Sequence, residues 1–252
     1  MIKKIKINTM RKFGLVGKNI DYSFSKAYFR NKFQKFNIDA EYENFDIDDI
    51  KEFKKIIKKE KKLAGLNVTT PYKESIMDLL DDIDDNAKNI GAVNTIKITD
   101  GKLIGFNTDA YGFVKSLFTL LEKQHQKALV LGSGGASKAI CSGLKSFDVE
   151  YLVVTRKPKN DNQISYEQLS QDIIEDHKLI INCTPLGTHP NIHQSPDIPY
   201  KHIGFKHFLY DLVYNPKVTT FLAQGSNQGA KICNGYDMLR FQAERSWEIW
   251  NS

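Results

Sequence analysis

Short apolar segments alternate with longer amphipathic segments along the first third of the chain. The predicted strands and helices follow one another in this order: strand 12–16, helix 25–36, strand 41–45, helix 48–59, strand 64–68, and a third helix starting at Pro71. Alternation of this kind predicts a parallel sheet with helices packed on its faces. We therefore expect an α/β fold.

A hairpin and a long helix follow. Residues 93–98 and 102–105 flank Asp100-Gly101, a dipeptide typical of a two-residue hairpin turn. Residues 108–122 are predicted to form one long helix, because apolar residues recur on one face of it: Tyr111, Val114, Leu117, Leu120 and Leu121. A polar connector over 123–127 then leads to a new strand.

The second half repeats the strand–helix–strand pattern. Strands are predicted over 127–131 and 151–154 with a helix over 136–145 between them, and further strands follow at 179–182 and 208–212. A helix between Val218 and Gln224 and an amphipathic, aromatic-rich segment over 238–250 complete the chain. The renewed alternation predicts a second α/β domain.

Composition limits the possible classes of protein. With 252 residues, 41% of them hydrophobic and 26% charged, the chain has the make-up of a globular protein with an ample core. The net charge of +6 is weak evidence for nucleic-acid binding, because 30 acidic residues dilute the basic ones. No apolar run approaches the roughly 20 residues that a membrane helix needs, and Met1–Met10 lacks the apolar core of a secretory signal.

The cysteines indicate the redox environment. Cys141, Cys183 and Cys233 are odd in number and have no paired spacing, which predicts free thiols and no metal site. Free thiols favour a reducing compartment, so the cytoplasm is the expected location.

Glycines cluster between the strand at 127–131 and the helix that follows it. Gly132, Gly134 and Gly135, followed by Ala136, permit a tight turn and let backbone N–H groups approach a pyrophosphate at the helix N-terminus. The spacing alone also fits a structural turn. Its place inside a strand–helix–strand unit favours a nucleotide site.

The end of the next strand selects the cofactor. An acidic residue there would favour NAD, because it binds the ribose 2′-hydroxyl. This chain has Thr155, Arg156 and Lys157 instead, which suit the 2′-phosphate of NADP. A solvated basic loop is the alternative. Thr184, beyond a later apolar strand, is predicted to line the cofactor path, although a simple turn also explains it.

Lys73 is the candidate acid/base group. Pro71 suits the first position of a helix and would place Lys73 in its first turn. The positive end of a helix dipole lowers the pKa of a lysine, and a lysine that deprotonates more easily can transfer protons. An ordinary surface lysine is the alternative.

Other residues that handle a hydroxyl proton are missing from the first half of the chain. All six histidines lie between His125 and His207, and no cysteine precedes Cys141. A His–Asp pair of the lactate dehydrogenase type and a zinc site of the alcohol dehydrogenase type are therefore disfavoured.

Further polar residues accompany Lys73. Asp109 falls near a helix N-terminus, either as a cap or as the partner that orients Lys73, and a carboxylate partner would raise the lysine pKa. Asn94 is predicted at the centre of a short strand, where its amide needs either a substrate hydroxyl or neighbouring backbone as a partner. Ser23 and Ser25 suit a ligand carboxylate, although Ser25 alone fits an N-cap.

Taken together and in order, these segments resemble the shikimate dehydrogenase family across nearly the whole chain. The matching motifs are Phe13-Gly-Leu-Val-Gly17 with Ser23-x-Ser25, Asn67-Val-Thr-Thr-Pro-Tyr-Lys73, Gly91-Ala-Val-Asn-Thr95, Asn107-Thr-Asp109, Gly132-x-Gly-Gly-Ala136, Asn182-Cys-Thr-Pro-Leu-Gly187, Asp211-Leu-Val-Tyr214-Asn-Pro and Gly235-Tyr-Asp-Met-Leu-Arg-Phe-Gln242.

The resemblance implies reversible, NADP-dependent oxidation of the shikimate 3-hydroxyl to 3-dehydroshikimate, in the biosynthesis of chorismate and aromatic amino acids. It makes Lys73 and Asp109 the catalytic pair. The substrate-binding residues that it implies are Ser23, Ser25, Thr69, Asn94, Tyr214 and Gln242. The cofactor-binding residues are Gly132, Gly134, Gly135, Ala136, Thr155, Arg156, Lys157, Thr184 and Gly235.

The resemblance also implies two domains with a cleft between them. A three-layer α/β substrate-binding domain is expected over 1–108, rejoined by the C-terminal helix over 236–252, and a Rossmann-like NADP-binding domain over 109–235. The expected partner is a small-molecule substrate, with no nucleic acid and no membrane, and the protein is a monomer or a homodimer. Two alternatives stay open: a quinate/shikimate dehydrogenase that uses NAD, and a non-catalytic NADP-binding regulatory paralogue.

Overall fold

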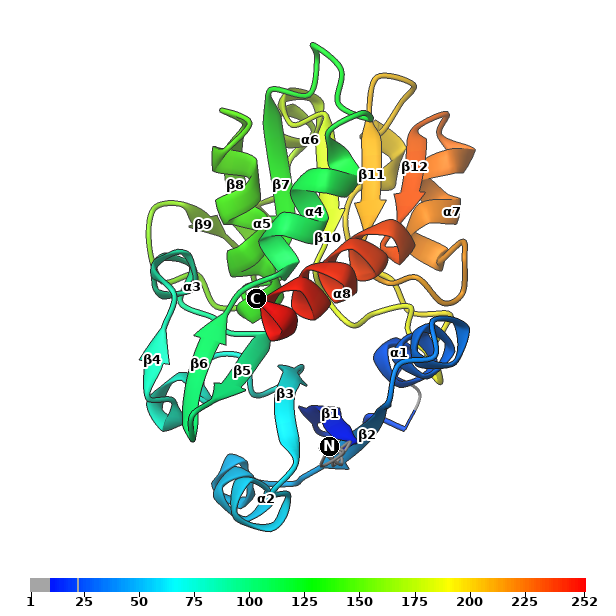
Figure 1. Cartoon of the computed structure of the whole chain (residues 1–252). Coiled ribbons are helices and arrows are strands. Elements are labelled where there is room, and N and C mark those ends of the chain that lie inside the picture. The colour runs from blue at the N-terminus through cyan, green and yellow to red at the C-terminus, as the bar shows by residue number, and fades with distance from the viewer. Residues whose placement is uncertain (1–9, 22) are drawn as a thin grey trace, which may run out of the picture. The chain divides into compact units, whose positions relative to one another are not determined.

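Two sheets organise the chain (Figure 1). The computed structural model describes residues 10–21 and 23–252, and within them each sheet has six strands. The chain divides into two compact units. The first unit runs up to Thr108 and includes Ala243–Ser252, and the second unit is Asp109–Gln242.

The first unit contains a mixed sheet with the strand order β2-β1-β3-β5-β6-β4. Its strands are β1 (Arg11–Gly17), β2 (Ala40–Asp46), β3 (Leu63–Val68), β4 (Asp82–Ile83), β5 (Thr95–Thr99) and β6 (Lys102–Phe106). β1 pairs in parallel with β2 and β3, as the alternation predicted, whereas β5 runs antiparallel to β3. Its helices are α1 (Phe24–Lys35), α2 (Phe53–Lys59) and α3 (Asp85–Ile90), with the short 3₁₀ helices η1 (Ile50–Glu52) and η2 (Met77–Leu79).

The predicted hairpin is confirmed. β5 and β6 pair antiparallel, and Asp100 and Gly101 between them have φ angles of 50° and 76°. Both angles lie in the left-handed region that a two-residue hairpin turn requires. The helix expected over 48–59 is present, but its first turn is the 3₁₀ helix η1, where the Asp49 side chain accepts from the Lys51 amide at 2.9 Å.

The prediction of a helix starting at Pro71 is wrong. Residues 70–76 form turns, and the next helical residues are those of η2. In an α-helix the Lys73 carbonyl would accept from the Met77 amide. Instead it accepts from Val93 N at 2.7 Å, while Met77 N donates to Glu74 O at 3.2 Å. A tertiary hydrogen bond has replaced the intrahelical one, so Lys73 does not lie in the first turn of a helix.

The second unit contains a fully parallel sheet with the strand order β12-β11-β10-β7-β8-β9. Its strands are β7 (Lys127–Leu131), β8 (Glu150–Val154), β9 (Gln163–Ile164), β10 (Leu179–Asn182), β11 (Phe208–Asp211) and β12 (Lys231–Asn234). Helices α4 (Asp109–Leu117), α5 (Gly135–Lys145), α6 (Gln171–Asp176) and α7 (Thr220–Asn227) belong to this unit. Because the strands are parallel, their carboxyl ends lie along one edge of the sheet.

The long helix expected over 108–122 is shorter than predicted. α4 ends at Leu117, and the amides of Leu120 and Leu121 both donate to the Leu117 carbonyl in a turn. Leu120 and Leu121 still pack against the core, whereas Phe118 is 71% exposed. Apolar periodicity therefore identified Leu117 as buried and Leu120 and Leu121 as packed against the core. It was wrong for Tyr111, which is 38% exposed, it missed the fully buried Phe113, and it did not predict where the helix stops.

Both faces of the parallel sheet are buried, which explains its continuous apolar strands. In β7, Ala128 and Val130 join a cluster with Phe113 of α4 and Ile140 of α5. On the other face, the second cluster consists of Leu129, Leu131, Ile180, Leu209, Phe221, Leu222 and their neighbours.

The C-terminal helix α8 (Tyr236–Asn251) contributes to the core of the first unit. Trp250 is buried against Phe13, with ring centroids 4.8 Å apart, and its Nε1 donates to the Ile96 carbonyl at 3.0 Å. A Cβ atom on Gly65 would lie 2.2 Å from the Trp250 ring, so β3 needs glycine at this point. Among the described residues, no helix has the length and hydropathy to cross a membrane.

Candidate functional site

The glycine-rich turn follows β7 as predicted. Gly132 has a φ of +108°, which favours glycine, and its amide donates to the Val154 carbonyl at 2.8 Å. α5 begins at Gly135, directly after Gly134. A Cβ atom on Gly134 would meet nothing within 4 Å, so open space lies in front of the N-terminus of an 11-residue helix. Backbone N–H groups and the helix dipole suit a pyrophosphate there.

Thr155 lies beside this turn. It is buried at the end of β8, and its Oγ1 is 3.0 Å from Ser133 Oγ, a residue of the turn itself. Arg156 and Lys157 follow and are exposed. The structure therefore brings the turn and the predicted 2′-phosphate residues to one place within the second unit. Sequence reasoning missed Ser133.

Thr184 reaches the same place from the end of β10. A Cβ atom on Gly132 would lie 3.3 Å from Thr184 Cγ2, so the two residues are neighbours. Asn182 orients Thr184, because its Oδ1 accepts from the Thr184 amide at 3.0 Å and from the Thr184 hydroxyl at 2.6 Å.

Gly235 follows β12 at this edge of the sheet. A Cβ atom there would lie 2.2 Å from the Leu212 carbonyl oxygen, so Gly235 permits close packing against the residue that follows β11. The structure thus gives Gly235 a packing reason, and its predicted contact with the cofactor stays a prediction.

Lys73 and Thr69 lie in the segment that follows β3. The Lys73 carbonyl accepts from Val93 N, which places Lys73 next to the segment that carries Asn94. Thr69 N donates to the Val16 carbonyl at 2.9 Å, and a Cβ atom on Gly17 would lie 2.5 Å from Thr69 Cγ2. Backbone hydrogen bonds therefore position both predicted residues, Thr69 against β1 and Lys73 against the segment that precedes β5.

Asn94 is buried, but it does not lie at the centre of a strand, as the sequence suggested. It directly precedes β5. Its Oδ1 accepts from Thr108 N at 2.7 Å, and its Nδ2 donates to Thr108 Oγ1 at 3.0 Å. These bonds link Asn94 to the residue just before Asp109.

A buried hydroxyl–amide network lies beneath Asn94. Ser246 Oγ is 2.8 Å from Thr95 Oγ1 and 3.2 Å from Thr108 Oγ1, and Asn67 Nδ2 donates to Ser246 Oγ at 3.0 Å. All four residues are nearly inaccessible to solvent. Sequence reasoning missed this network because α8 supplies Ser246 from far along the chain.

Ser23 and Ser25 take different positions on α1. Ser23 occupies the N-cap position without a side-chain cap, and its hydroxyl donates to Asn44 Oδ1 at 3.1 Å. Ser25 lies inside the helix and is buried, so the N-cap interpretation of Ser25 is wrong. Its hydroxyl shares a hydrogen bond with Tyr42, whose own hydroxyl donates to Asn67 Oδ1 at 2.8 Å. Burial raises the pKa of Tyr42, which keeps its hydroxyl protonated.

Asp109, Gln242 and Tyr214 belong to the second unit. Asp109 is the first residue of α4 and is buried, as is Gln242 on α8. A Cβ atom on Gly112 would lie 3.0 Å from Gln242 Cβ, so α4 and α8 pack closely one turn from Asp109. Burial raises the pKa of Tyr214. Lys73 belongs to the first unit, and its pairing with Asp109 stays a prediction.

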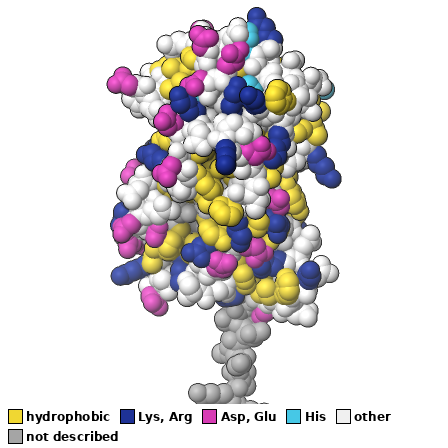
Figure 2. Space-filling view, turned by 90° about the horizontal axis from the view of Figure 1, so that it is seen from above, with side chains coloured by type: hydrophobic (Ala, Val, Ile, Leu, Met, Phe, Trp, Pro, Cys, Tyr) yellow, Lys and Arg dark blue, Asp and Glu magenta, His cyan; other side chains and the backbone are white. Residues whose placement is uncertain are grey.

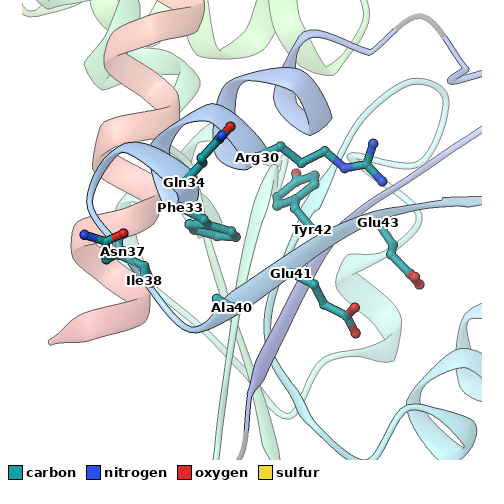
Figure 3. A pocket seen from close by; sticks show the side chains of 9 residues that line it. All are labelled: Arg30, Phe33, Gln34, Asn37, Ile38, Ala40, Glu41, Tyr42 and Glu43. Atoms are coloured by element: carbon teal, nitrogen blue, oxygen red, sulfur yellow. The ribbon is translucent and has the colours of Figure 1, made fainter.

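A surface pocket of the first unit is lined in part by Tyr42, the hydrogen-bond partner of Ser25 (Figure 3). It has a volume of about 470 Å³ and is lined by residues of α1, β2 and the loop between them. None of the predicted site residues lines it. On the face that Figure 2 shows, basic and acidic side chains are interspersed. Among the described residues, no three or more His, Cys, Asp or Glu side chains are grouped so that they could hold a metal ion.

Comparison with known proteins assigns the family. Residues 15–96 match the model of the shikimate dehydrogenase substrate binding domain. A protein of Methanococcus maripaludis named shikimate dehydrogenase (NADP(+)) is 38% identical over an alignment of 257 positions, which covers 94% of this chain and 90% of that protein. The chain belongs to the shikimate dehydrogenase family. Its N-terminal α/β domain is thus of the family's substrate-binding type.

Solved structures of shikimate dehydrogenases have the same fold. The enzyme of Peptoclostridium difficile is 40% identical, with a TM-score of 0.83 over 96% of this chain and 92% of that one. The Thermus thermophilus enzyme, solved in complex with NADP(H) and shikimate, is 28% identical, with a TM-score of 0.82 over 96% and 92% of the two chains. The predicted α/β fold with a Rossmann-like second domain is confirmed.

Some residues that shape this shikimate dehydrogenase fold were not singled out from the sequence. Asn182 and Asp211 each end a strand inside a recognised motif and are fully buried. A polar residue at the end of an apolar strand, next to a turn, is a sequence signal by which both residues could have been found. Ser246 had no such signal, because nothing local distinguishes it from other serines on a helix.

Proposed function

We propose that this protein is an NADP-dependent shikimate dehydrogenase. It catalyses the reversible oxidation of the shikimate 3-hydroxyl to 3-dehydroshikimate, a step in the biosynthesis of chorismate and aromatic amino acids. The observation that carries the proposal is the similarity to relatives of that name over nearly the full length of both chains. The motifs match in order from Ser23 to Gln242.

The second unit fits the cofactor. Open space at Gly134 in front of α5, the Ser133–Thr155 contact and the neighbouring Arg156 and Lys157 form a site for a dinucleotide with a 2′-phosphate. Thr184 extends the site along the same sheet edge. NADP, when bound, supplies the hydride acceptor for the oxidation.

The chain's own residues handle the substrate proton. We assign to Lys73 Nζ the acceptance of the 3-hydroxyl proton, and to Asp109 the orientation of that amine. Ser23 and Ser25 bind the substrate carboxylate with help from Tyr214. The ring hydroxyls are bound by Thr69, Asn94 and Gln242.

The hydrogen bonds of the first unit support these substrate roles. Thr108 fixes the rotamer of Asn94 through two bonds, and Tyr42 fixes that of Ser25. Side chains held in this way bind a ligand with less loss of conformational entropy.

The proposed location is the cytoplasm, because the three cysteines are free thiols. The proposed partner is the small-molecule substrate, and the protein is a monomer or a homodimer.

The test is an assay of the purified chain with shikimate or quinate, each with NADP⁺ or NAD⁺, followed by absorbance of the reduced nicotinamide. We expect reduction with shikimate and NADP⁺, and much weaker reduction in the other combinations. A preference for NAD⁺ or quinate would favour the broader quinate/shikimate activity. Absence of turnover in all four combinations, with NADP⁺ still bound, would identify a regulatory paralogue.

A further inference from the structure

Asp211 is the most completely buried carboxylate that the proposed chemistry does not use. It ends β11, its side chain is 0% exposed, and three groups donate hydrogen bonds to it. Oδ1 accepts from Asn182 Nδ2 at 2.9 Å and from Val213 N at 3.0 Å, and Oδ2 accepts from Thr219 Oγ1 at 2.5 Å. A buried carboxylate is costly unless its lone pairs are occupied, and here each oxygen has a donor.

The first of these bonds leads to the cofactor side of the sheet. Asn182 Nδ2 donates to Asp211 Oδ1 at 2.9 Å and to the Leu186 carbonyl at 3.4 Å, and its Oδ1 accepts from the amide and hydroxyl of Thr184. Thr184 is the neighbour of Gly132 in the glycine-rich turn. The shortest hydrogen bond of the Thr184 hydroxyl is therefore the one to Asn182, and the shorter of the two Asn182 Nδ2 bonds is the one to Asp211.

The other two bonds fix Asp211 itself. Val213 N belongs to the segment after β11, and Thr219 caps α7 by accepting from Leu222 N at 3.3 Å. Burial raises the pKa of Asp211 to about 6, and the hydrogen bonds from Thr219, Val213 and Asn182 oppose that rise. At pH 8 the carboxylate is therefore the form that accepts from Asn182.

We propose that Asp211 is a positioning residue for NADP. Its carboxylate orients Asn182, which in turn presents Thr184 to the cofactor beside the glycine-rich turn. The inference rests on the proposed function, because it requires NADP to bind along this sheet edge.

The test compares NADP⁺ binding by calorimetry with steady-state kinetics at pH 8, on the full chain. Asp211→Ala is expected to raise the NADP⁺ dissociation constant and the KM for NADP⁺ about tenfold, the effect of one lost charge-assisted hydrogen bond. Asn182→Ala removes the link alone and is expected to have the same effect, with the KM for shikimate within about twofold of the wild type. If Asp211→Ala does not fold, the Asn182→Ala variant alone tests the proposal.

Two further variants separate positioning from mere stability. Asp211→Asn places a carbonyl oxygen where Asn182 and Val213 donate, and its amide can donate to Thr219 Oγ1, so NADP⁺ affinity should stay within about threefold of the wild type. Ser116→Ala is the matched control. It removes a buried hydroxyl of the same unit that lies 2.7 Å from Tyr210 Oη, and we expect lower thermal stability with unchanged NADP⁺ affinity.

The outcomes distinguish the two proposals. A wild-type chain that binds no NADP⁺ overturns both the proposed function and the role of Asp211. A wild-type chain that binds NADP⁺ while Asn182→Ala and folded Asp211→Ala bind it equally well overturns the positioning role alone. Equal weakening by Ser116→Ala would also overturn it, because a general loss of stability would then explain the effect.

Discussion

The two units are built as different kinds of binding site. In the second unit, the candidate cofactor site consists of loops at the carboxyl ends of parallel strands, with glycines, a helix N-terminus and exposed cations. In the first unit, the candidate substrate site consists of buried or half-buried side chains, and hydrogen bonds to Thr108 and Tyr42 orient Asn94 and Ser25. The difference suits the proposed ligands, since a dinucleotide presents phosphates to backbone amides, whereas a polyol needs directed side-chain partners.

The comparison also concerns where each unit obtains its stability. The residues of the second unit form one continuous stretch, Asp109–Gln242. The first unit depends on Ala243–Ser252, which supply Trp250 to its core and Ser246 to its buried network. Changes near the end of the chain should therefore affect the first unit before the second.

The largest expected effect is that of Lys73→Ala on turnover. Loss of the proton acceptor should lower kcat about 10²–10⁴-fold, the contribution of a positioned acid/base group, with a small change in shikimate affinity. The measurement is kcat together with shikimate binding by calorimetry. Lys55→Ala, an exposed lysine on α2 of the same unit, is the control. Wild-type turnover in Lys73→Ala would remove the assigned role and leave the first unit as a binding domain only.

Trp250→Ala should cause the next largest effect, on stability. It removes the indole that packs on Phe13 and the hydrogen bond to the Ile96 carbonyl, and truncation of a buried Trp costs about 3–5 kcal/mol. The free energy of unfolding is measured with urea, and Trp250→Phe should lose less because it keeps an aromatic ring. Folded protein of both variants should bind NADP⁺ normally. A loss of NADP⁺ binding free energy as large as the loss in the free energy of unfolding would contradict the expectation that changes near the end of the chain affect the first unit before the second.

Arg156→Ala should have an intermediate effect, confined to the cofactor. The KM for NADP⁺ is expected to rise about 10- to 100-fold, since a hydrogen bond to a charged group contributes about 1.5–3 kcal/mol. The KM for NAD⁺ should change little because NAD⁺ lacks the 2′-phosphate. Lys145→Ala, an exposed cation at the end of α5, is the matched control. A parallel rise for both cofactors would show that Arg156 acts on the shape of the loop.

The smallest expected effect is that of low pH on the stability of the second unit. Burial lowers the pKa of both His125 and His207, and both belong to this unit. The folded state favours neutral imidazoles, because both histidines have a lowered pKa there. In the unfolded state a histidine takes up a proton as the pH falls through its usual pKa of about 6.5, so the unfolded state then binds more protons. The free energy of unfolding should therefore fall by less than about 1.4 kcal/mol per histidine for each pH unit. Asp211 acts in the opposite direction, because its raised pKa stabilises the folded state as the pH falls from about 6.

Two spectroscopic probes and one histidine variant can show which unit and which residue cause the loss of stability at low pH. Both tryptophans, Trp247 and Trp250, lie in the first unit, so fluorescence reports that unit while far-UV circular dichroism reports the whole chain. Between pH 7.5 and 5.5 the dichroism midpoint in urea should fall more than the fluorescence midpoint. His125→Asn, which keeps an acceptor for Glu122 N, should reduce that fall, and His193→Asn, an exposed histidine, should not. Equal shifts of both midpoints in every variant would contradict this account.

Part of the second unit could be predicted from its sequence almost to the residue. β7 and β10 have the predicted bounds, and α5 begins one residue early. Its signals are local, since β7 and β8 are each followed directly by the turn or the cations that are predicted to bind the cofactor. Five elements were missed, none of them longer than six residues: β4 and α3 of the first unit and β9, α6 and β12 of the second.

The first unit shows where local signals fail. Pro71 favoured a helix start, but the Val93 amide takes the Lys73 carbonyl and the chain forms turns instead. Ser25 fitted an N-cap but lies inside α1, where it bonds Tyr42. Each error arose because a partner distant in sequence outcompeted a weak local preference.

The sequence by itself determined the family, the alternation of strands and helices, and the residue types available for chemistry. Those features depend on local order along the chain. Only the tertiary structure decided that Asn94 is oriented by Thr108, that Asn182 joins Thr184 to Asp211 by hydrogen bonds, and that Ser246 and Trp250 complete the first unit. These contacts join residues between 14 and 154 positions apart, apart from the short Asn182–Thr184 link, and a buried polar group takes whichever partner the packed chain brings within hydrogen-bond distance.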